Sequence, residues 1–168
     1  MRSLYILRHG TAEWTSPGGD RERPLQDRGR TEARTIGLYL SELGEAPQLI
    51  LASNAVRASE TVELARESGG WTAEVRVESR LYEASLSTLL EVVNNVEGDI
   101  ERLLLCGHQP VCGLLIGELT RTRAPDFPTA SLARIDAEIA SWAELDRGKG
   151  QLEWLMSPGG KTGTSNRE

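Results

Sequence analysis

Apolar residues along this chain form short continuous runs that alternate with stripes of helical spacing. Six strands are predicted at residues 4–7, 49–52, 75–77, 102–106, 132–135 and 152–155. The first, second and fourth runs carry almost no polar interruption, which is typical of strands covered on both faces of a sheet. The alternation of strands with helices favours an α/β fold with a largely parallel sheet.

The helical stripes lie between these runs. Ala33, Ile36, Leu40 and Leu43 recur at helical spacing, with Glu32 assigned to the solvent side. A second stripe covers 86–96, with the preceding serine as N-cap, and a third helix starts near the proline at position 110. We therefore predict a three-layer α/β/α sandwich whose last two strands form a hairpin through 146–150.

The length of 168 residues suits one domain, which we place at 1–158. Residues 159–168 are small and polar, and they are predicted to form a flexible tail. Two segments rich in proline, glycine and charge, 11–24 and 121–129, are interpreted as loops, the first of them beside the site described below.

Composition narrows the function. The net charge of −6 does not favour nucleic acid as a partner, and no apolar stretch approaches the ~20 residues needed to cross a bilayer. A strand that begins by residue 4 leaves no room for a signal peptide, so a cytoplasmic location is expected. Cys106 and Cys112 have no ligand partners at zinc-like spacing, and we expect two reduced structural cysteines and no metal or other cofactor.

The two histidines of the chain occupy matching positions. Arg8, His9 and Gly10 come directly after the first apolar run, and His108 comes after the fourth. Ligands of open α/β sheets bind outside the carboxyl ends of the strands, where both histidines are expected. An arginine and two imidazoles at that edge indicate a two-histidine phosphoryl-transfer site.

Several motifs resemble one known family. Arg-His-Gly at 8–10 with a distant second histidine is similar to the histidine phosphatase superfamily, and the match is closer to its small SixA-type branch of phosphohistidine phosphatases. Further stretches carry the resemblance: Arg-Pro-Leu at 23–25, and residues 53–58, 81–85, 127–133 and 154–158. The resemblance implies a phosphoglycerate mutase-like fold and a phosphatase that works through a phosphohistidine intermediate on the enzyme.

The resemblance also implies roles for four residues. His9 is the expected nucleophile, as a neutral imidazole whose other ring nitrogen donates to a carbonyl near Gly10. Arg8 and Arg57 are expected to bind the phosphate oxygens through their guanidinium forks. His108 is expected to stabilise the transition state, either as an imidazolium or as a neutral donor.

Other residues are weaker candidates. Gly10 would let the backbone pass close to the phosphate, Thr11 is a possible donor to a phosphate oxygen, and Gln109 opens a helix whose N–H groups could face the anion. Glu83 stands where related enzymes carry the acid that protonates the leaving group, or it is a solvent-facing carboxylate before a helix. Thr129 and Ser131 are expected near the pocket without an assigned role.

Three functions remain open from the sequence. The first is a phosphatase that acts on phosphohistidine of another protein, such as a signalling phosphotransfer domain. A chain this short is expected to leave its nucleophile in an open groove, which such a protein could reach. The second is a phosphatase for small phosphomonoesters with Glu83 as acid. The third is a catalytically silent phosphate-binding module, which the set of two histidines and two arginines argues against.

Overall fold

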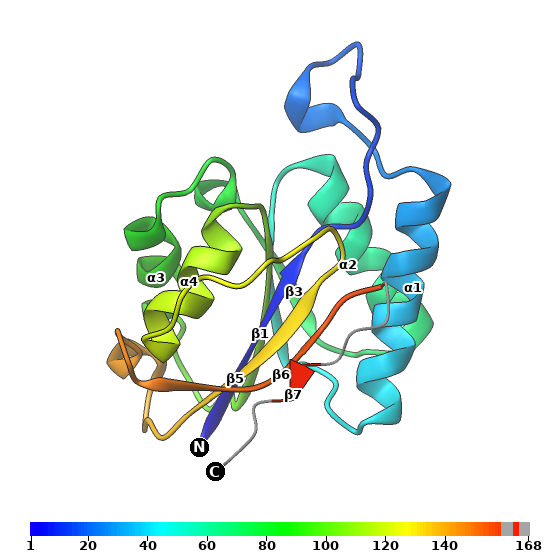
Figure 1. Ribbon diagram of the computed structural model, residues 1–168. Helices are drawn as coiled ribbons and strands as arrows, with labels where there is room; N and C mark the ends of the chain where they lie inside the picture. The colour runs from blue at the N-terminus through cyan, green and yellow to red at the C-terminus, as the bar shows by residue number, and fades with distance from the viewer. Residues whose placement is uncertain (159–162, 165–168) are drawn as a thin grey trace.

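A mixed β-sheet forms the centre of the protein (Figure 1). The computed structural model describes residues 1–158 and 163–164. Within them the strand order is β3-β2-β4-β1-β5-β6-β7. The strands are β1 (Arg2–Arg8), β2 (Leu49–Ser53), β3 (Glu74–Glu78), β4 (Arg102–Gly107), β5 (Leu132–Ala137), β6 (Gly150–Met156) and β7 (Gly163–Thr164). Strands β1 to β4 are mutually parallel, β5 is antiparallel to β1, and β6 runs with β1 again. The predicted mostly parallel α/β sheet is confirmed.

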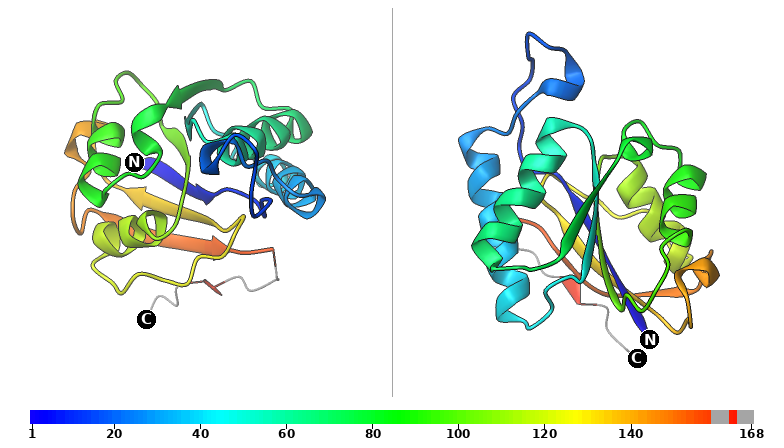
Figure 2. Two further views of the ribbon diagram at one scale, coloured as in Figure 1. Left: turned by 90° about the horizontal axis from the view of Figure 1, so that it is seen from above. Right: turned by 180° about the vertical axis from the view of Figure 1, so that it is seen from behind.

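Helices cover both faces of the sheet, as Figure 2 shows from two further directions. They are α1 (Asp27–Glu42), α2 (Val56–Gly69), α3 (Leu86–Asn94) and α4 (Val111–Thr120), with short 3-10 helices η1 (Asp20–Glu22), η2 (Ser79–Leu81) and η3 (Trp142–Glu144). Helices α1 and α2 pack in one hydrophobic core, and α3 and α4 pack in the other. The three-layer α/β/α sandwich is therefore confirmed.

The continuous apolar runs supply both cores at once. In β1, Leu4 and Ile6 join the core under α3 and α4, whereas Tyr5 and Leu7 join the core under α1 and α2. Successive side chains of a strand point to opposite faces, so a strand covered on both sides needs apolar residues at every position. This requirement explains why the central strands show no alternation of apolar and polar residues.

The carboxyl ends of strands β1 and β4 lie side by side and form a candidate position for a ligand site. The two strands are parallel neighbours, with Arg8 opposite Gly107 at their carboxyl ends. The helix after β1 packs on one face of the sheet and the helix after β4 packs on the other. Ligands of α/β sheets bind in the crevice where the connections from two neighbouring strands run to opposite faces of the sheet. The residues that follow Arg8 and Gly107 therefore meet in this crevice.

Several local predictions are tested by the structure. The Ser85 side chain caps α3 by accepting a hydrogen bond from the backbone N–H of Thr88, as predicted. That helix ends at Asn94 rather than at position 96. The predicted pairing of the last two long strands is confirmed, with η3 inserted in their connection. Of the tail predicted at 159–168, only 163–164 are described, as β7, and the rest lies outside the described residues.

Glu32 corrects the solvent-facing assignment. Its side chain is only 7% exposed, and it accepts a hydrogen bond of 2.9 Å from the backbone N–H of Thr11. The loop after β1 crosses α1 closely here, because a Cβ at Gly29 would lie 2.1 Å from the Thr11 carbonyl oxygen. The carboxylate on the buried side of α1 thus satisfies a backbone donor that the loop would otherwise leave without a partner.

No helix in the described part of the chain is long and apolar enough to cross a membrane.

Candidate active site

His9 leaves β1 with its imidazole held in one orientation. Its backbone N–H donates to the carbonyl of Gly107 at 3.3 Å, and its own carbonyl accepts from Ala130 at 2.9 Å. The ring atom Nδ1 lies 2.8 Å from the carbonyl oxygen of Gly10. A carbonyl can only accept, so Nδ1 carries the proton and Nε2 keeps its lone pair. The expected carbonyl partner of a nucleophilic His9 is present.

His108 approaches the same crevice from β4. Its ring centroid lies 5.2 Å from that of His9, with an angle of 55° between the planes. Its Nε2 is 2.8 Å from Oγ of Ser53, at the end of β2, and its Nδ1 is buried with no hydrogen-bond partner in the described part of the chain. The structure thus brings the two predicted histidines together.

The two predicted arginines flank this pair. A terminal nitrogen of Arg8 donates to the carbonyl of Phe127 at 3.2 Å, while its Nε is buried and has no partner within the described residues. Arg57 lies in the first turn of α2 and is 7% exposed. Buried donors are rarely left unpaired in native proteins. The Nε of Arg8 and the Nδ1 of His108 are therefore two buried nitrogens for which the described residues supply no hydrogen-bond partner.

Burial keeps both imidazoles neutral. It lowers the pKa of His9 to about 3, although the Gly10 hydrogen bond acts in the opposite direction, and the positive charges of Arg57 and Arg8 lower this pKa further. Burial, followed by the charge of Arg57, lowers the pKa of His108 to about 4. A neutral imidazole has the free lone pair that a nucleophile needs. In the ligand-free protein His108 is therefore a neutral group, and a bound anion would favour its protonation.

Three residues of the site escaped the sequence analysis. Ser53 contacts His108, and the Tyr82 ring meets His108 edge-on with centroids 5.8 Å apart. Asp20 of η1 accepts hydrogen bonds from Arg57 and Tyr82. Ser53 is the last residue of β2 and directly follows its apolar run. That position at the ligand-binding edge of the sheet could have identified Ser53 as a site residue from the sequence. For Asp20 the only signal in the sequence was its position in the loop that was predicted to lie beside the site.

The remaining candidates lie around the cluster. Thr11 Oγ1 is 3.2 Å from Thr129 Oγ1. Gln109 precedes α4, which begins at Val111, and its side-chain oxygen accepts from the backbone N–H of Gly113 at 2.8 Å. The hydroxyl of Ser131 is buried without a partner in the described chain. The contacts of these residues with a phosphate group remain predictions.

Gly10 is required by packing. A Cβ at this position would lie 2.8 Å from the carbonyl oxygen of Gly29, closer than real Cβ contacts allow. The glycine therefore lets the loop after β1 approach α1, which is the ordinary structural use of a glycine at the end of a strand. Its predicted close approach to phosphate stays untested.

Glu83 lies in the segment between η2 and α3, beside Tyr82. Its backbone has a φ of 55°, in the left-handed region, and its side chain is exposed. Within residues 1–158 and 163–164 the carboxylate makes no hydrogen bond or ion pair. Glu83 is therefore free to move toward a leaving group, but no contact in the structure assigns it that role.

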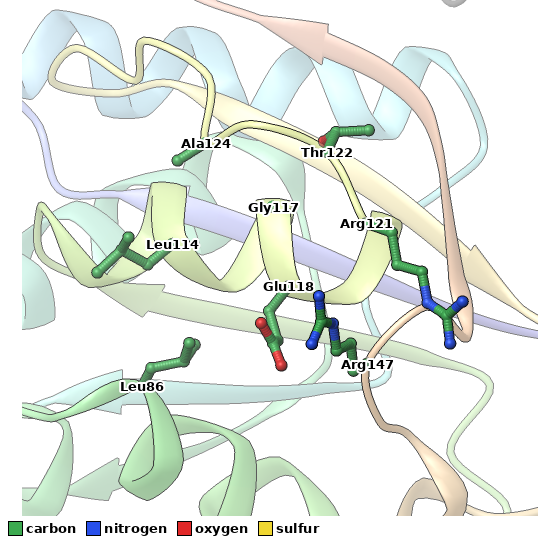
Figure 3. Close-up of a pocket in the computed structure, with 8 residues that line it drawn as sticks. All are labelled: Leu86, Leu114, Gly117, Glu118, Arg121, Thr122, Ala124 and Arg147. Carbon is green, nitrogen blue, oxygen red and sulfur yellow. The ribbon is translucent and has the colours of Figure 1, made fainter.

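A separate hollow lies away from the histidines. Figure 3 shows its eight lining residues, Leu86, Leu114, Gly117, Glu118, Arg121, Thr122, Ala124 and Arg147. None of them belongs to the two-histidine cluster. The described residues also include no group of three or more histidine, cysteine or acidic residues arranged to hold a metal ion. The cluster around His9 is therefore the candidate reaction site.

Known proteins of similar sequence and structure carry the same architecture. The family model for the histidine phosphatase superfamily (branch 1) matches residues 4–91. An uncharacterised protein of Mycobacterium tuberculosis is 30% identical over 90% of this chain and 99% of its own. The phosphohistidine phosphatase SixA of Escherichia coli is 28% identical over 92% of this chain and 93% of its own.

Solved structures agree with these sequence relatives. A putative phosphohistidine phosphatase SixA from Nakamurella multipartitia has a TM-score of 0.81 and 25% identity over 94% of this chain and 96% of its own. The protein histidine phosphatase SixA complexed with tungstate has a TM-score of 0.78 and 25% identity over 93% and 97% of the two chains. With the family match covering more than half of its length, the chain belongs to the histidine phosphatase superfamily, branch 1.

Proposed function

We propose that this phosphatase hydrolyses phosphohistidine on another protein, with His9 as the nucleophile and a phosphorylated His9 as the intermediate. The observation that carries the proposal is the pairing of a neutral, oriented His9 with His108 and with unpartnered nitrogens on Arg8 and His108. Such an arrangement offers a lone pair and an anion-binding surface together, which are the two requirements of phosphoryl transfer.

The first step transfers the phosphoryl group to the enzyme. The Nε2 lone pair of His9 attacks phosphorus, and the bond from phosphorus to the substrate imidazole breaks. The electron pair of that bond returns to the leaving imidazole, which takes up one proton from solvent. Arg8, Arg57 and His108 donate hydrogen bonds to the phosphoryl oxygens, because these groups concentrate positive charge where the transition state is most negative.

The second step releases phosphate. Water attacks the phosphorus of phosphorylated His9, the bond from phosphorus to Nε2 breaks, and the water loses a proton as inorganic phosphate forms. His9 returns to its neutral form with Nδ1–H on the Gly10 carbonyl. The fixed hydrogen bond supports both steps, because it holds the ring in the tautomer that attacks and then leaves.

The choice of phosphohistidine as substrate is supported by the chain's relatives and by the leaving group. Two proteins similar to this chain over nearly their whole length carry the name phosphohistidine phosphatase SixA, that of Escherichia coli and, as a putative one, that of Nakamurella multipartitia. An imidazole leaves more readily than an alkoxide, so its departure depends less on a general acid. The exposed, unpaired Glu83 of this structure fits a reaction with that reduced need.

The test is a comparison of substrates at matched enzyme concentration. A phosphotransfer domain phosphorylated on histidine is compared with a panel of small phosphomonoesters, and the His9→Ala variant serves as the blank. We expect kcat/KM for the phosphohistidine protein to exceed every phosphomonoester by more than an order of magnitude. Preference for a phosphomonoester would overturn the proposal and favour the small-molecule alternative. Binding of phosphate with no turnover of either class would favour the silent binding module.

A further inference from the structure

Asp20 contacts the proposed phosphate-binding arginine from outside the histidine pair. It lies in η1, on the loop after β1 that rises above the sheet at the carboxyl end of that strand (Figure 1). Its backbone carbonyl accepts a hydrogen bond of 2.8 Å from one terminal nitrogen of Arg57. Its carboxylate accepts a bond of 3.2 Å from the other terminal nitrogen. Both terminal nitrogens of the guanidinium are thus held by one residue.

The same carboxylate has two further partners. The Tyr82 hydroxyl donates to it at 2.6 Å, and a terminal nitrogen of Arg23 donates to it at 2.8 Å. The Tyr82 ring in turn lies edge-on against His108. Asp20 therefore joins the loop after β1, the first turn of α2 and the wall beside the second histidine.

The surroundings of the carboxylate favour its ionised form. The hydrogen bonds from Tyr82 and Arg23 hold the pKa of Asp20 far below its usual range, and the charge of Arg57 adds to the effect. An acceptor that stays charged forms stronger hydrogen bonds than a neutral one. Asp20 is therefore a fixed anchor and cannot serve as a proton donor.

Asp20 leaves the anion site itself open. A guanidinium has five N–H donors, and Asp20 takes one from each terminal nitrogen of Arg57. Among the described residues it makes no hydrogen bond to Arg8, His9 or His108. The Nε of Arg8 and the Nδ1 of His108 remain unpartnered, so the Asp20 carboxylate does not lie within hydrogen-bond distance of either nitrogen.

We propose that Asp20 is a positioning residue, which holds the Arg57 guanidinium in the orientation that binds the phosphoryl group. This inference rests on the proposed function, because it assumes that Arg57 contacts phosphate. Arg57 has a long side chain whose rotamers would otherwise have to be ordered by the ligand, and an arginine fixed in advance avoids that entropic cost on binding.

The test is a double-mutant cycle between Asp20 and Arg57. Dissociation constants for inorganic phosphate are measured by calorimetry for the wild type, Asp20→Ala, Arg57→Ala and the double variant, and kcat and KM are measured with the phosphohistidine protein. We expect Asp20→Ala to weaken phosphate binding and lower kcat/KM by roughly tenfold, the lower end of the range for residues that orient ligands. Asp20→Asn, which keeps an acceptor oxygen, should lose less.

The cycle separates positioning from a general effect on the fold. In the Arg57→Ala background, Asp20→Ala should change phosphate binding less than twofold, because its action passes through Arg57. Asp27→Ala is the matched control: this fully exposed carboxylate pairs with Arg30 and should leave binding unchanged. Should Asp20→Ala fail to fold by thermal melting, the same cycle is run with Asp20→Asn.

Two results would overturn the proposal. Equal or tighter phosphate binding in Asp20→Ala would mean that the carboxylate is inert or competes with the anion. A full tenfold loss in both backgrounds would mean that Asp20 acts independently of Arg57. Phosphate binding needs no turnover, so failure of the wild type to hydrolyse phosphohistidine would refute the proposed function and leave the binding cycle interpretable.

Discussion

The imidazole rings of His9 and His108 lie 5.2 Å apart at their centroids, although they come from distant parts of the chain. The cause is the order of the strands: β1 and β4 are parallel neighbours, so the residues that follow them emerge side by side. Each ring has one nitrogen fixed by a partner, the Gly10 carbonyl for His9 and the Ser53 hydroxyl for His108. These two partners therefore hold the neighbouring rings in defined orientations.

Both histidines should titrate well below the usual value. Burial lowers the pKa of His9 to about 3 and that of His108 to about 4. NMR titration can follow both rings, since the chain has only two histidines, and the spectrum of His108→Gln assigns the two signals. We expect midpoints below pH 5 in phosphate-free buffer and an upward shift of the His108 midpoint when phosphate is added. Midpoints near 6.5 for both rings would contradict the buried, neutral pair.

The same shifts predict how stability depends on pH. Between the folded-state pKa values and about 6.5, the unfolded chain binds protons that the folded protein does not, so the free energy of unfolding falls as pH falls through this window. Each histidine should contribute a loss of about 1.6 kcal/mol between pH 6.5 and 5. Urea unfolding across this range measures the slope. His108→Gln should reduce the slope by about half, and an unchanged slope in that variant would rule out the effect.

Glu83 distinguishes the two kinds of substrate. If phosphohistidine is the substrate, Glu83→Gln should leave its hydrolysis nearly unchanged, because imidazole leaves without strong acid assistance. Hydrolysis of an alkyl phosphate by the same variant should fall by roughly 100-fold, the scale of a lost general acid. Steady-state rates with both substrates provide the measurement. A comparable loss on phosphohistidine would show that Glu83 protonates the leaving imidazole as well.

Activity should not depend on a metal ion. In the proposed mechanism Arg8 and Arg57 place positive charge at the phosphoryl oxygens, which is the contribution that a cation would make. Turnover of the phosphohistidine protein should therefore persist after dialysis against a chelator. A loss of activity that a divalent ion restores would require a metal in the reaction.

The sequence predicted those parts of the structure that depend on local pattern. Strands buried on both faces need uninterrupted apolar runs, so the runs located β1, β2 and β4 together with the histidines after β1 and β4. The contacts of Asp20 with Arg57 and Tyr82 could not be predicted in this way. They join polar side chains from three segments, and polar contacts across elements leave no periodic trace in the sequence.

The prediction that Glu32 faces solvent was wrong for a related reason. Helical spacing distinguishes an apolar stripe from the rest of a helix. It does not show that the loop after β1 covers part of the side that was predicted to face solvent. The backbone N–H of Thr11 needs an acceptor where that loop meets α1, and Glu32 supplies it. A buried carboxylate of this kind is recognised only when the paths of both segments are known.

The most direct test of the mechanism is the capture of phosphorylated His9. The enzyme is mixed briefly with a radiolabelled phosphohistidine protein, quenched in base and analysed by peptide mapping. We predict an acid-labile, base-stable label on His9, no label and no turnover in His9→Ala, and slow turnover in His108→Ala, which removes a donor worth about 3–4 kcal/mol in comparable anion sites. Full turnover in His9→Ala, or a label on another residue, would contradict the mechanism.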